Sequence, residues 1–165
     1  MEDSFDSNVI ARRGWRQGAI LGPTLVEHAH QHAPGQVERK GDDCLIVTSH
    51  DCDIVARSLG KEPVVEILRG DTADPEEVDA QQVAGRNPRI LQMDIEMDGS
   101  RKLLSCSVHD RWFIPRELLL QEDPAMFLPD KERRLVAEWL AKRYIRPAFP
   151  TAFDNRWRGR MRAWK

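Results

Sequence analysis

Residues 44–55 read CLIVTSHDCDIV. In this stretch a run of branched apolar residues, ending at Val47, passes without a spacer into polar and reactive side chains. Such a run is typical of a buried strand whose end carries the following side chains to the surface. The sequence therefore predicts a strand over Cys44–Thr48 and a candidate site at Ser49–Asp53, where a hydroxyl, an imidazole, a thiol and two carboxylates follow one another.

Alternating and turn-forming residues on both sides of this stretch predict a small sheet. Apolar residues alternate with polar ones over residues 91–97, Asp98-Gly99 forms a turn, and a second alternating segment returns through residue 108. Further elements are expected at residues 15–21 (strand), 23–32 (helix), 54–59 (short helix capped by Asp53), 63–68 (strand) and 71–77 (acidic loop). We expect an α+β fold with a small, strongly bent antiparallel SH3-like barrel of about five strands, followed by C-terminal helices.

The pattern changes near Pro115, where helical signals replace alternation. Residues 109–115 are expected to connect the sheet to the helices, and Arg111 can pair with the acidic cluster at 51–53. A short helix is expected at 115–120 and a long one at 129–144. The long helix has five apolar residues on one face: Leu135, Val136, Trp139, Leu140 and Tyr144. The chain thus divides into a flexible leader (1–13), a barrel domain (14–114) and a helical C-terminal segment with a basic tail (115–165).

Composition limits the class of protein. The chain has 165 residues, of which 41% are hydrophobic and 32% charged, as in an ordinary soluble globular protein. It has no apolar stretch of the roughly 18 residues needed to span a bilayer, and its start is too acidic for a signal peptide. We therefore expect a cytoplasmic protein without a membrane partner, whose three cysteines stay reduced.

Positive charge is concentrated near the C-terminus. Residues 131–165 contain eleven Lys or Arg and three acidic residues, whereas the whole chain has a net charge of −2. Arginines are interleaved there with aromatic residues, a combination that single-stranded nucleic-acid sites use. The candidate nucleic-acid-binding residues are Arg143, Arg146, Arg156, Arg158, Arg160 and Arg162. The aromatic residues can instead anchor the tail to the domain, and a protein partner can bind the basic tail or the acidic body.

The residue types at Ser49–Asp53 argue against a nucleophilic cysteine. Cys52 lies between Asp51 and Asp53, and two carboxylates destabilise the thiolate that a nucleophile needs. The same residues have a structural interpretation, in which Asp53 caps a helix and Asp51 accepts backbone hydrogen bonds.

A metal site at His50–Asp53 would need ligands from elsewhere, because neighbouring residues cannot all converge on one ion. His109-Asp110 is one source, and His28 with His32 is another, one helical turn apart. A solvated polar helix face is the commoner explanation for such a pair. We expect no bound metal or cofactor.

Several motifs resemble a family of uncharacterised bacterial proteins associated with mobile elements and defence loci. They are GWRQG at 14–18, SHDCD at 49–53, NPR at 87–89, RWFIP at 111–115 and RYIRPAFP at 143–150. The resemblance implies a setting in a defence system and supplies no activity.

A second resemblance covers residues 16–69. The order and spacing of RQGAI at 16–20, Arg39, LIVTSHD at 45–51 and PVVEIL at 63–68 is similar to PemK/MazF-like toxins. That resemblance implies an SH3-like barrel that cuts single-stranded RNA without a metal. By the same resemblance, Arg39 would stabilise the phosphate charge, and Thr48 or Ser49 would assist proton transfer.

Three hypotheses follow for the function. The first is a nucleic-acid-binding barrel that cuts RNA through Arg39 and the residues Thr48, Ser49, His50, Asp51, Cys52 and Asp53. The second is a non-enzymatic binding or inhibitor protein of a defence system, with a protein partner from the same locus. The third is a metal-dependent enzyme centred on His50–Asp53. The sequence leaves the partner and the oligomeric state open.

Overall fold

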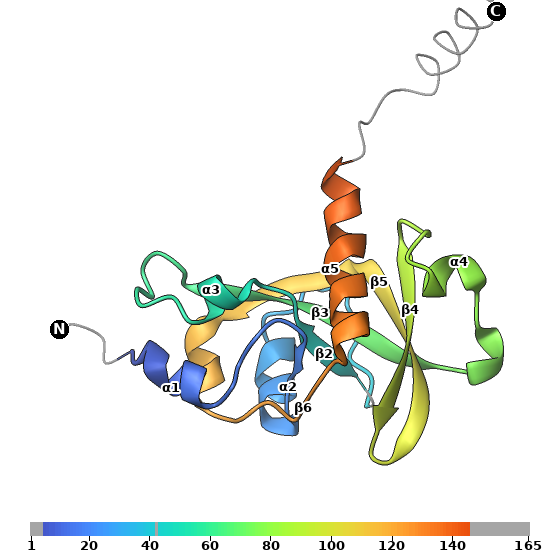
Figure 1. Ribbon diagram of the computed structural model, residues 1–165. Helices are drawn as coiled ribbons and strands as arrows, with labels where there is room; N and C mark the ends of the chain where they lie inside the picture. The colour runs from blue at the N-terminus through green and yellow to red at the C-terminus, as the bar shows by residue number, and fades with distance from the viewer. Residues whose placement is uncertain (1–4, 42, 146–165) are drawn as a thin grey trace, which may run out of the picture.

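The computed structural model describes residues 5–41 and 43–145 of the chain. Its class is α+β, as expected, with a strongly curled antiparallel half-barrel and a C-terminal helix (Figure 1). Within the described residues, the sheet has six strands in the order β4-β5-β3-β2-β1-β6. The strands are β1 (Ala19–Ile20), β2 (Cys44–Val47), β3 (Val64–Ala73), β4 (Ile90–Met97), β5 (Ser100–Pro115) and β6 (Met126–Phe127). The helices are α1 (Ser7–Arg12), α2 (Pro23–His30), α3 (Asp51–Ile54), α4 (Ala80–Val83) and α5 (Asp130–Ile145), with 3-10 turns η1 (Pro75–Glu77) and η2 (Arg116–Leu120).

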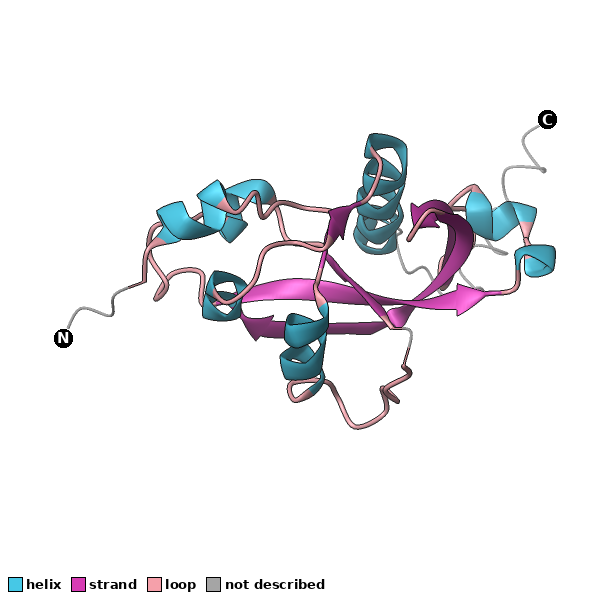
Figure 2. Ribbon diagram, turned by 90° about the horizontal axis from the view of Figure 1, so that it is seen from below, coloured by secondary structure: helices cyan, strands magenta, loops and turns pink. Residues whose placement is uncertain are grey.

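Strand β2 is buried because the sheet is covered on both faces. Leu45 and Val47 pack with residues of α1, α2 and η2 on one face. Ile46 belongs to a second core on the opposite face, together with residues of α5. Figure 2 shows helices on both sides of the sheet. The prediction that the apolar run is a buried strand is confirmed, and two-sided burial explains why the run does not alternate.

The sheet bends where β3 passes β5. Leu68 pairs with Arg111 and Gly70 pairs with Cys106, so the register between the two strands shifts at this point. Gly70 has little room for a side chain, because a Cβ placed there would lie 3.0 Å from the Cys106 sulfur. Such an irregularity increases the local twist and lets a strand bend. The bend lets the β4–β5 hairpin curl, as the right-hand part of Figure 1 shows.

The hairpin predicted from alternation is confirmed. Pairing of β4 with β5 runs from Ile90 opposite Ser107 to Met97 opposite Ser100. The turn residues Asp98 and Gly99 have φ angles of 53° and 71°. Positive φ at both positions is the geometry of the type I′ turn that Asp-Gly favours. Strand β5 then continues to residue 115, so the segment expected to connect the sheet to the helices is itself a strand.

Helix α5 covers the second core. Val136 and Trp139 are buried against the sheet, as predicted. The Trp139 indole N–H donates to the Asn87 carbonyl at 2.7 Å, which ties the helix to the loop before β4. Tyr144 was predicted on the same apolar face but is 74% exposed. The reason is that the last turns of α5 project beyond the sheet, as Figure 1 shows.

The expected flexible leader at 1–13 requires correction. Residues 7–12 form α1, and the Asp6 side chain caps this helix by accepting from the Asn8 backbone N–H. Ile10 is completely buried in the first core. Burial of an apolar side chain and a satisfied helix cap hold this segment in place.

Two further boundaries differ from the prediction. Residues 71–73 of the expected acidic loop belong to β3, and residues 74–77 lie outside the sheet. The expected domain border at residue 114 falls within β5, and β6 pairs with β1. The segment after 115 therefore completes the sheet as well as supplying helix α5, because β1 leaves an edge that β6 can pair.

Candidate functional site

The sheet face covered by α5 carries polar side chains near the last turn of that helix. Beyond the end of β2, the Thr48 backbone N–H still donates to the Glu66 carbonyl at 2.9 Å, so this pair extends the ladder. Glu66 is the cross-strand partner of Phe113 in β5. Thr48, Glu66 and Phe113 therefore lie side by side on one face, because directly opposed residues in a sheet point the same way.

The Glu66 carboxylate contacts two other side chains. Thr48 Oγ1 donates to Glu66 Oε2 at 2.9 Å, and Arg111 Nη1 lies 3.0 Å from Glu66 Oε1. The Ser49 hydroxyl accepts from the Glu66 backbone N–H at 2.8 Å. The side chains of Glu66 and Arg111 are 23% and 14% exposed, respectively. Solvent reaches both groups but screens their attraction only in part, so a carboxylate, a guanidinium and a hydroxyl are held together at an accessible place.

Strand β5 and helix α5 together orient Arg111. Its Nε donates to the Val108 carbonyl at 3.1 Å, and its Nη2 donates to the Tyr144 hydroxyl at 3.3 Å. With Glu66 on Nη1, the planar guanidinium is held from three directions. The expectation that Arg111 pairs with the acidic cluster at 51–53 is thus corrected: its ion pair is with Glu66, which its own sheet brings beside it.

The residues after Ser49 form helix α3 earlier than expected. His50 is the N-cap of α3, and Asp51 and Asp53 lie in its first turn. The prediction that Asp53 caps a helix starting at Ile54 is therefore wrong, because carboxylates are favourable throughout a first helical turn and not only at the cap. Asp51 accepts a backbone hydrogen bond, as predicted, but the donor is the distant Gln17 N–H at 2.7 Å and not a group of the turn itself.

A buried arginine holds the chain that follows α3. Arg116 is completely buried, and its guanidinium donates to four backbone carbonyls. The acceptors are Asp53 (2.8 Å), Ile54 (3.3 Å), Ala56 (2.7 Å) and Ser58 (3.0 Å). The Phe5 ring lies against the same group, with 4.6 Å between the guanidinium carbon and the ring centre. Arg116 therefore fixes Asp53, the last of the predicted site residues, and the chain that follows it.

Cys52 is exposed at the surface of α3. Its thiol donates to Asp53 Oδ1 at 3.3 Å, and this bond raises the pKa of Cys52 above its ordinary value, with smaller contributions from desolvation and from the Asp53 charge. A raised thiol pKa keeps the sulfur protonated and weakly nucleophilic. The environment of Cys52 thus agrees with the sequence argument against a nucleophilic cysteine.

Arg39 lies far from these residues. It precedes β2 whereas Thr48 and Ser49 follow it, and the four-residue strand alone spans about 10 Å. Its guanidinium pairs with the exposed Glu27 carboxylate, which raises the pKa of Arg39 and lowers that of Glu27. Arg39 also lines a groove of about 740 Å³ between α2 and the β4–β5 turn. The structure therefore does not bring Arg39 together with the other predicted catalytic residues.

Most of the predicted nucleic-acid-binding arginines cannot be placed. Arg143 is exposed on the last turns of α5. Arg146, Arg156, Arg158, Arg160 and Arg162 lie outside the described residues.

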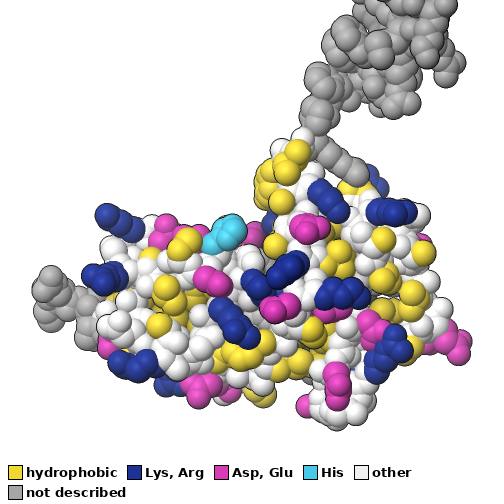
Figure 3. All heavy atoms as spheres, in the orientation of Figure 1, with side chains coloured by type: hydrophobic (Ala, Val, Ile, Leu, Met, Phe, Trp, Pro, Cys, Tyr) yellow, Lys and Arg dark blue, Asp and Glu magenta, His cyan; other side chains and the backbone are white. Residues whose placement is uncertain are grey.

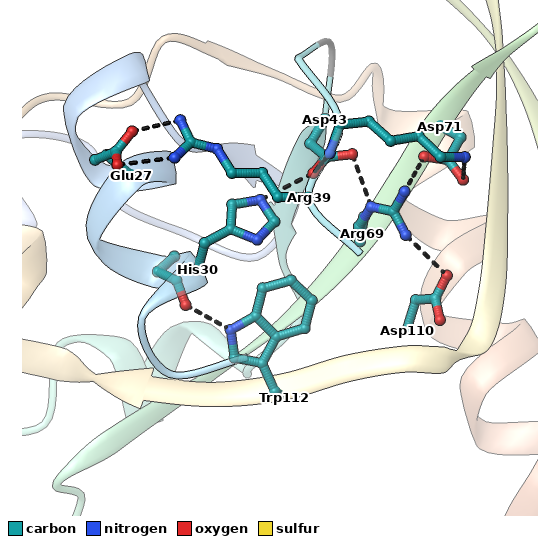
Figure 4. A network of polar contacts seen from close by, with 10 residues as sticks. Glu27, His30, Arg39, Asp43, Arg69, Asp71, Asp110 and Trp112 are labelled. Atoms are coloured by element: carbon teal, nitrogen blue, oxygen red, sulfur yellow. Dashed lines mark hydrogen bonds and ion pairs between the residues drawn. The ribbon is translucent and has the colours of Figure 1, made fainter. Parts of the chain in front are cut away.

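A buried ionic network occupies the opposite end of β2 (Figure 4). Arg69 contacts the carboxylates of Asp43 (2.7 Å), Asp110 (3.3 Å) and Asp71. His30 Nε2 lies 2.9 Å from Asp43 Oδ2. Burial lowers the pKa of His30, and this effect outweighs the opposing influence of Asp43. Each of these groups has an oppositely charged or polar neighbour, so the network has a structural explanation.

Sequence reasoning missed Glu66 and Arg111 as site residues. A signal for Glu66 existed, because it is a charged residue inside the apolar strand VVEIL at 64–68. A charge in such a strand either faces solvent or has a partner. The partner could not be identified from the sequence, because residues 66 and 111 meet only through the pairing of β3 with β5.

Among the described residues, no three His, Cys, Asp or Glu side chains converge in a way that could hold a metal ion. In the same ranges, no helix is both long and apolar enough to cross a membrane.

Comparison with known protein families, with curated proteins and with solved structures finds no match to this chain. The two resemblances stated above therefore stay predictions.

Proposed function

We propose that the protein cleaves single-stranded RNA without a metal, at a site formed by Thr48, Glu66 and Arg111, on a half-barrel related to the SH3-like fold. The observation that carries this proposal is the contact of the Glu66 carboxylate with the Arg111 guanidinium and the Thr48 hydroxyl at an accessible part of the sheet. A carboxylate can accept a proton from an attacking hydroxyl, and a guanidinium can stabilise the charge that develops on phosphate oxygens.

The reaction can be written with these groups alone. Glu66 takes the proton of a ribose 2′-hydroxyl, whose oxygen attacks the adjacent phosphorus. The bond from phosphorus to the 5′-oxygen of the next nucleotide breaks, and that oxygen takes a proton from solvent, which reaches the site because the Glu66 side chain is 23% exposed. The products are a 2′,3′-cyclic phosphate and a free 5′-hydroxyl. Arg111 donates to the non-bridging oxygens, and the bond from Thr48 orients the Glu66 carboxylate.

This proposal assigns the phosphate contact to Arg111 instead of Arg39. The resemblance to PemK/MazF-like toxins implied an arginine near Thr48 or Ser49. Arg111 meets that requirement, because it shares the Glu66 carboxylate with Thr48. Arg39 lies before β2 and pairs with Glu27.

The test is cleavage of a fluorescent single-stranded RNA in the presence of EDTA. Glu66→Gln keeps the shape of the side chain and an oxygen for Thr48, but it removes the base, and we expect kcat to fall by about 10²–10⁴-fold. Glu96→Gln changes an exposed carboxylate in the hairpin and should leave kcat unchanged. Arg39→Ala should also leave it unchanged, which separates the two arginines. Absence of cleavage by the unmodified protein, or full activity of Glu66→Gln, would contradict the proposal.

A further inference from the structure

Large apolar side chains are exposed around the Arg111–Glu66 pair. The described residues include five large hydrophobic side chains that are exposed, and four of them lie at this end of the molecule: Val64, Phe113, Tyr144 and Ile145. Phe113 is 59% exposed and Tyr144 is 74% exposed. Figure 3 shows exposed hydrophobic side chains over the outer end of α5. Such a concentration of exposed aromatic surface marks an interaction site.

Each member of the ion pair has an exposed aromatic residue as a neighbour. Phe113 is the cross-strand neighbour of Glu66 and stands two residues after Arg111, about 7 Å along the strand. Arg111 Nη2 donates to the Tyr144 hydroxyl at 3.3 Å, whereas Glu66 lies against Nη1. Tyr144 therefore contacts the arginine of the ion pair, and Phe113 is the cross-strand neighbour of its carboxylate partner.

Resting on the function proposed above, we propose that Phe113 and Tyr144 stack nucleobases on the two sides of the phosphate that Arg111 contacts. The substrate class is then RNA that is single-stranded over both nucleotides, because bases in a duplex stack on each other and cannot offer a face to a side chain. Stacking on an aromatic ring accepts any base, so the site should tolerate sequence changes while rejecting duplexes.

The charges around this surface favour a nucleic acid over an apolar protein partner. Arg111 contacts the Tyr144 hydroxyl, and Arg143, which precedes Tyr144 in α5, is exposed. The described structure ends at Ile145, and the sequence continues from there with six Lys or Arg and one acidic residue. A phosphate backbone held by cations, with bases on aromatic rings, is the usual combination in single-stranded nucleic-acid sites.

The experiment measures binding without cleavage. The probe is a fluorescein-labelled 2′-O-methyl RNA decamer, whose blocked 2′-oxygen cannot attack, and the readout is fluorescence anisotropy. Phe113→Ala should raise the Kd for the single strand about tenfold, and Phe113→Trp should restore it. Val78→Ala is the matched control, because Val78 is the fifth exposed large hydrophobic and lies beside η1. Its Kd should equal that of the unmodified protein, and the duplex form of the probe should bind at least tenfold more weakly.

Two results would overturn this inference. One is an unchanged Kd for Phe113→Ala; the other is equal binding of the single strand and the duplex. If Phe113→Ala leaves the Kd unchanged and converts a dimer to a monomer in gel filtration, the surface is a protein interface and the proposal is refuted. Weaker binding by Phe113→Ala combined with full cleavage by Glu66→Gln would support stacking and reject only the catalytic proposal.

Discussion

Replacement of Arg116 by Met tests whether one buried side chain holds residues 53–58, which begin at the last predicted site residue. The guanidinium donates to four backbone carbonyls between residues 53 and 58, and the side chain is completely buried. Burial lowers the pKa of Arg116, partly offset by Glu62 and Asp53. The lowered pKa means that burial of the charged guanidinium costs free energy. This cost offsets part of the stabilisation that the hydrogen bonds provide.

The magnitude follows from these two opposing effects. A hydrogen bond to a charged group contributes about 1.5–3 kcal/mol. Nη1 has two hydrogens for three of the four carbonyls, so the contacts amount to about three bonds, or about 4.5 kcal/mol at the lower end. Removal of the guanidinium also recovers a desolvation cost of several kcal/mol, and water can reach part of the released loop. We therefore expect Arg116→Met to lower the free energy of unfolding by about 3 kcal/mol, or about 9 °C in Tm for a chain of this size.

Urea unfolding followed by tryptophan fluorescence measures this change, and hydrogen exchange locates it. Amides of residues 54–59 should lose protection in Arg116→Met before the core strands do. Arg57→Met is the control, because Arg57 is exposed in the same segment and should change the unfolding free energy by less than about 0.5 kcal/mol. Arg116→Lys keeps the charge without the fork and should fall between the two. A loss below about 1 kcal/mol for Arg116→Met would refute the reasoning.

Two other predictions concern titratable groups. His30 has a pKa below 6.5 in the folded protein, so the unfolded chain binds its proton first as the pH falls. The free energy of unfolding should therefore decrease as the pH drops below about 6.5, and His30→Gln should reduce this slope in urea titrations at several pH values; an unchanged slope would contradict it. Asp53→Ala should lower the raised pKa of Cys52 and speed its reaction with iodoacetamide at pH 8, measured by mass spectrometry. Burial raises the pKa of Cys44 to about 12, so Cys44 should not react while the protein is folded. If Cys52 is alkylated at the same rate with and without Asp53, then Asp53 is not the cause of its raised pKa.

Local patterns predicted those elements whose cause is local. The apolar run at 44–47, the alternation on both sides of Asp98-Gly99 and the helical face of 129–144 were read directly from the sequence. Each of these patterns depends on which side of a single element is buried. Strand β2, the β4–β5 hairpin and helix α5 confirm the three predictions. The helical start at residue 7 was missed, because six residues carry too little periodicity to be distinguished from a polar leader.

The candidate site depends on contacts between residues far apart in the chain. Glu66 meets Arg111 because β3 pairs with β5, and the register of that pairing shifts at Gly70. A shift of one residue would turn every side chain to the other face of the sheet. The sequence by itself determined that a buried strand ends in polar groups beside the protein surface. Only the tertiary structure decided that Arg111, and not Arg39, lies beside these polar groups. The reason is that strand register and the bend of the sheet are set by packing across the whole core and not by any local pattern.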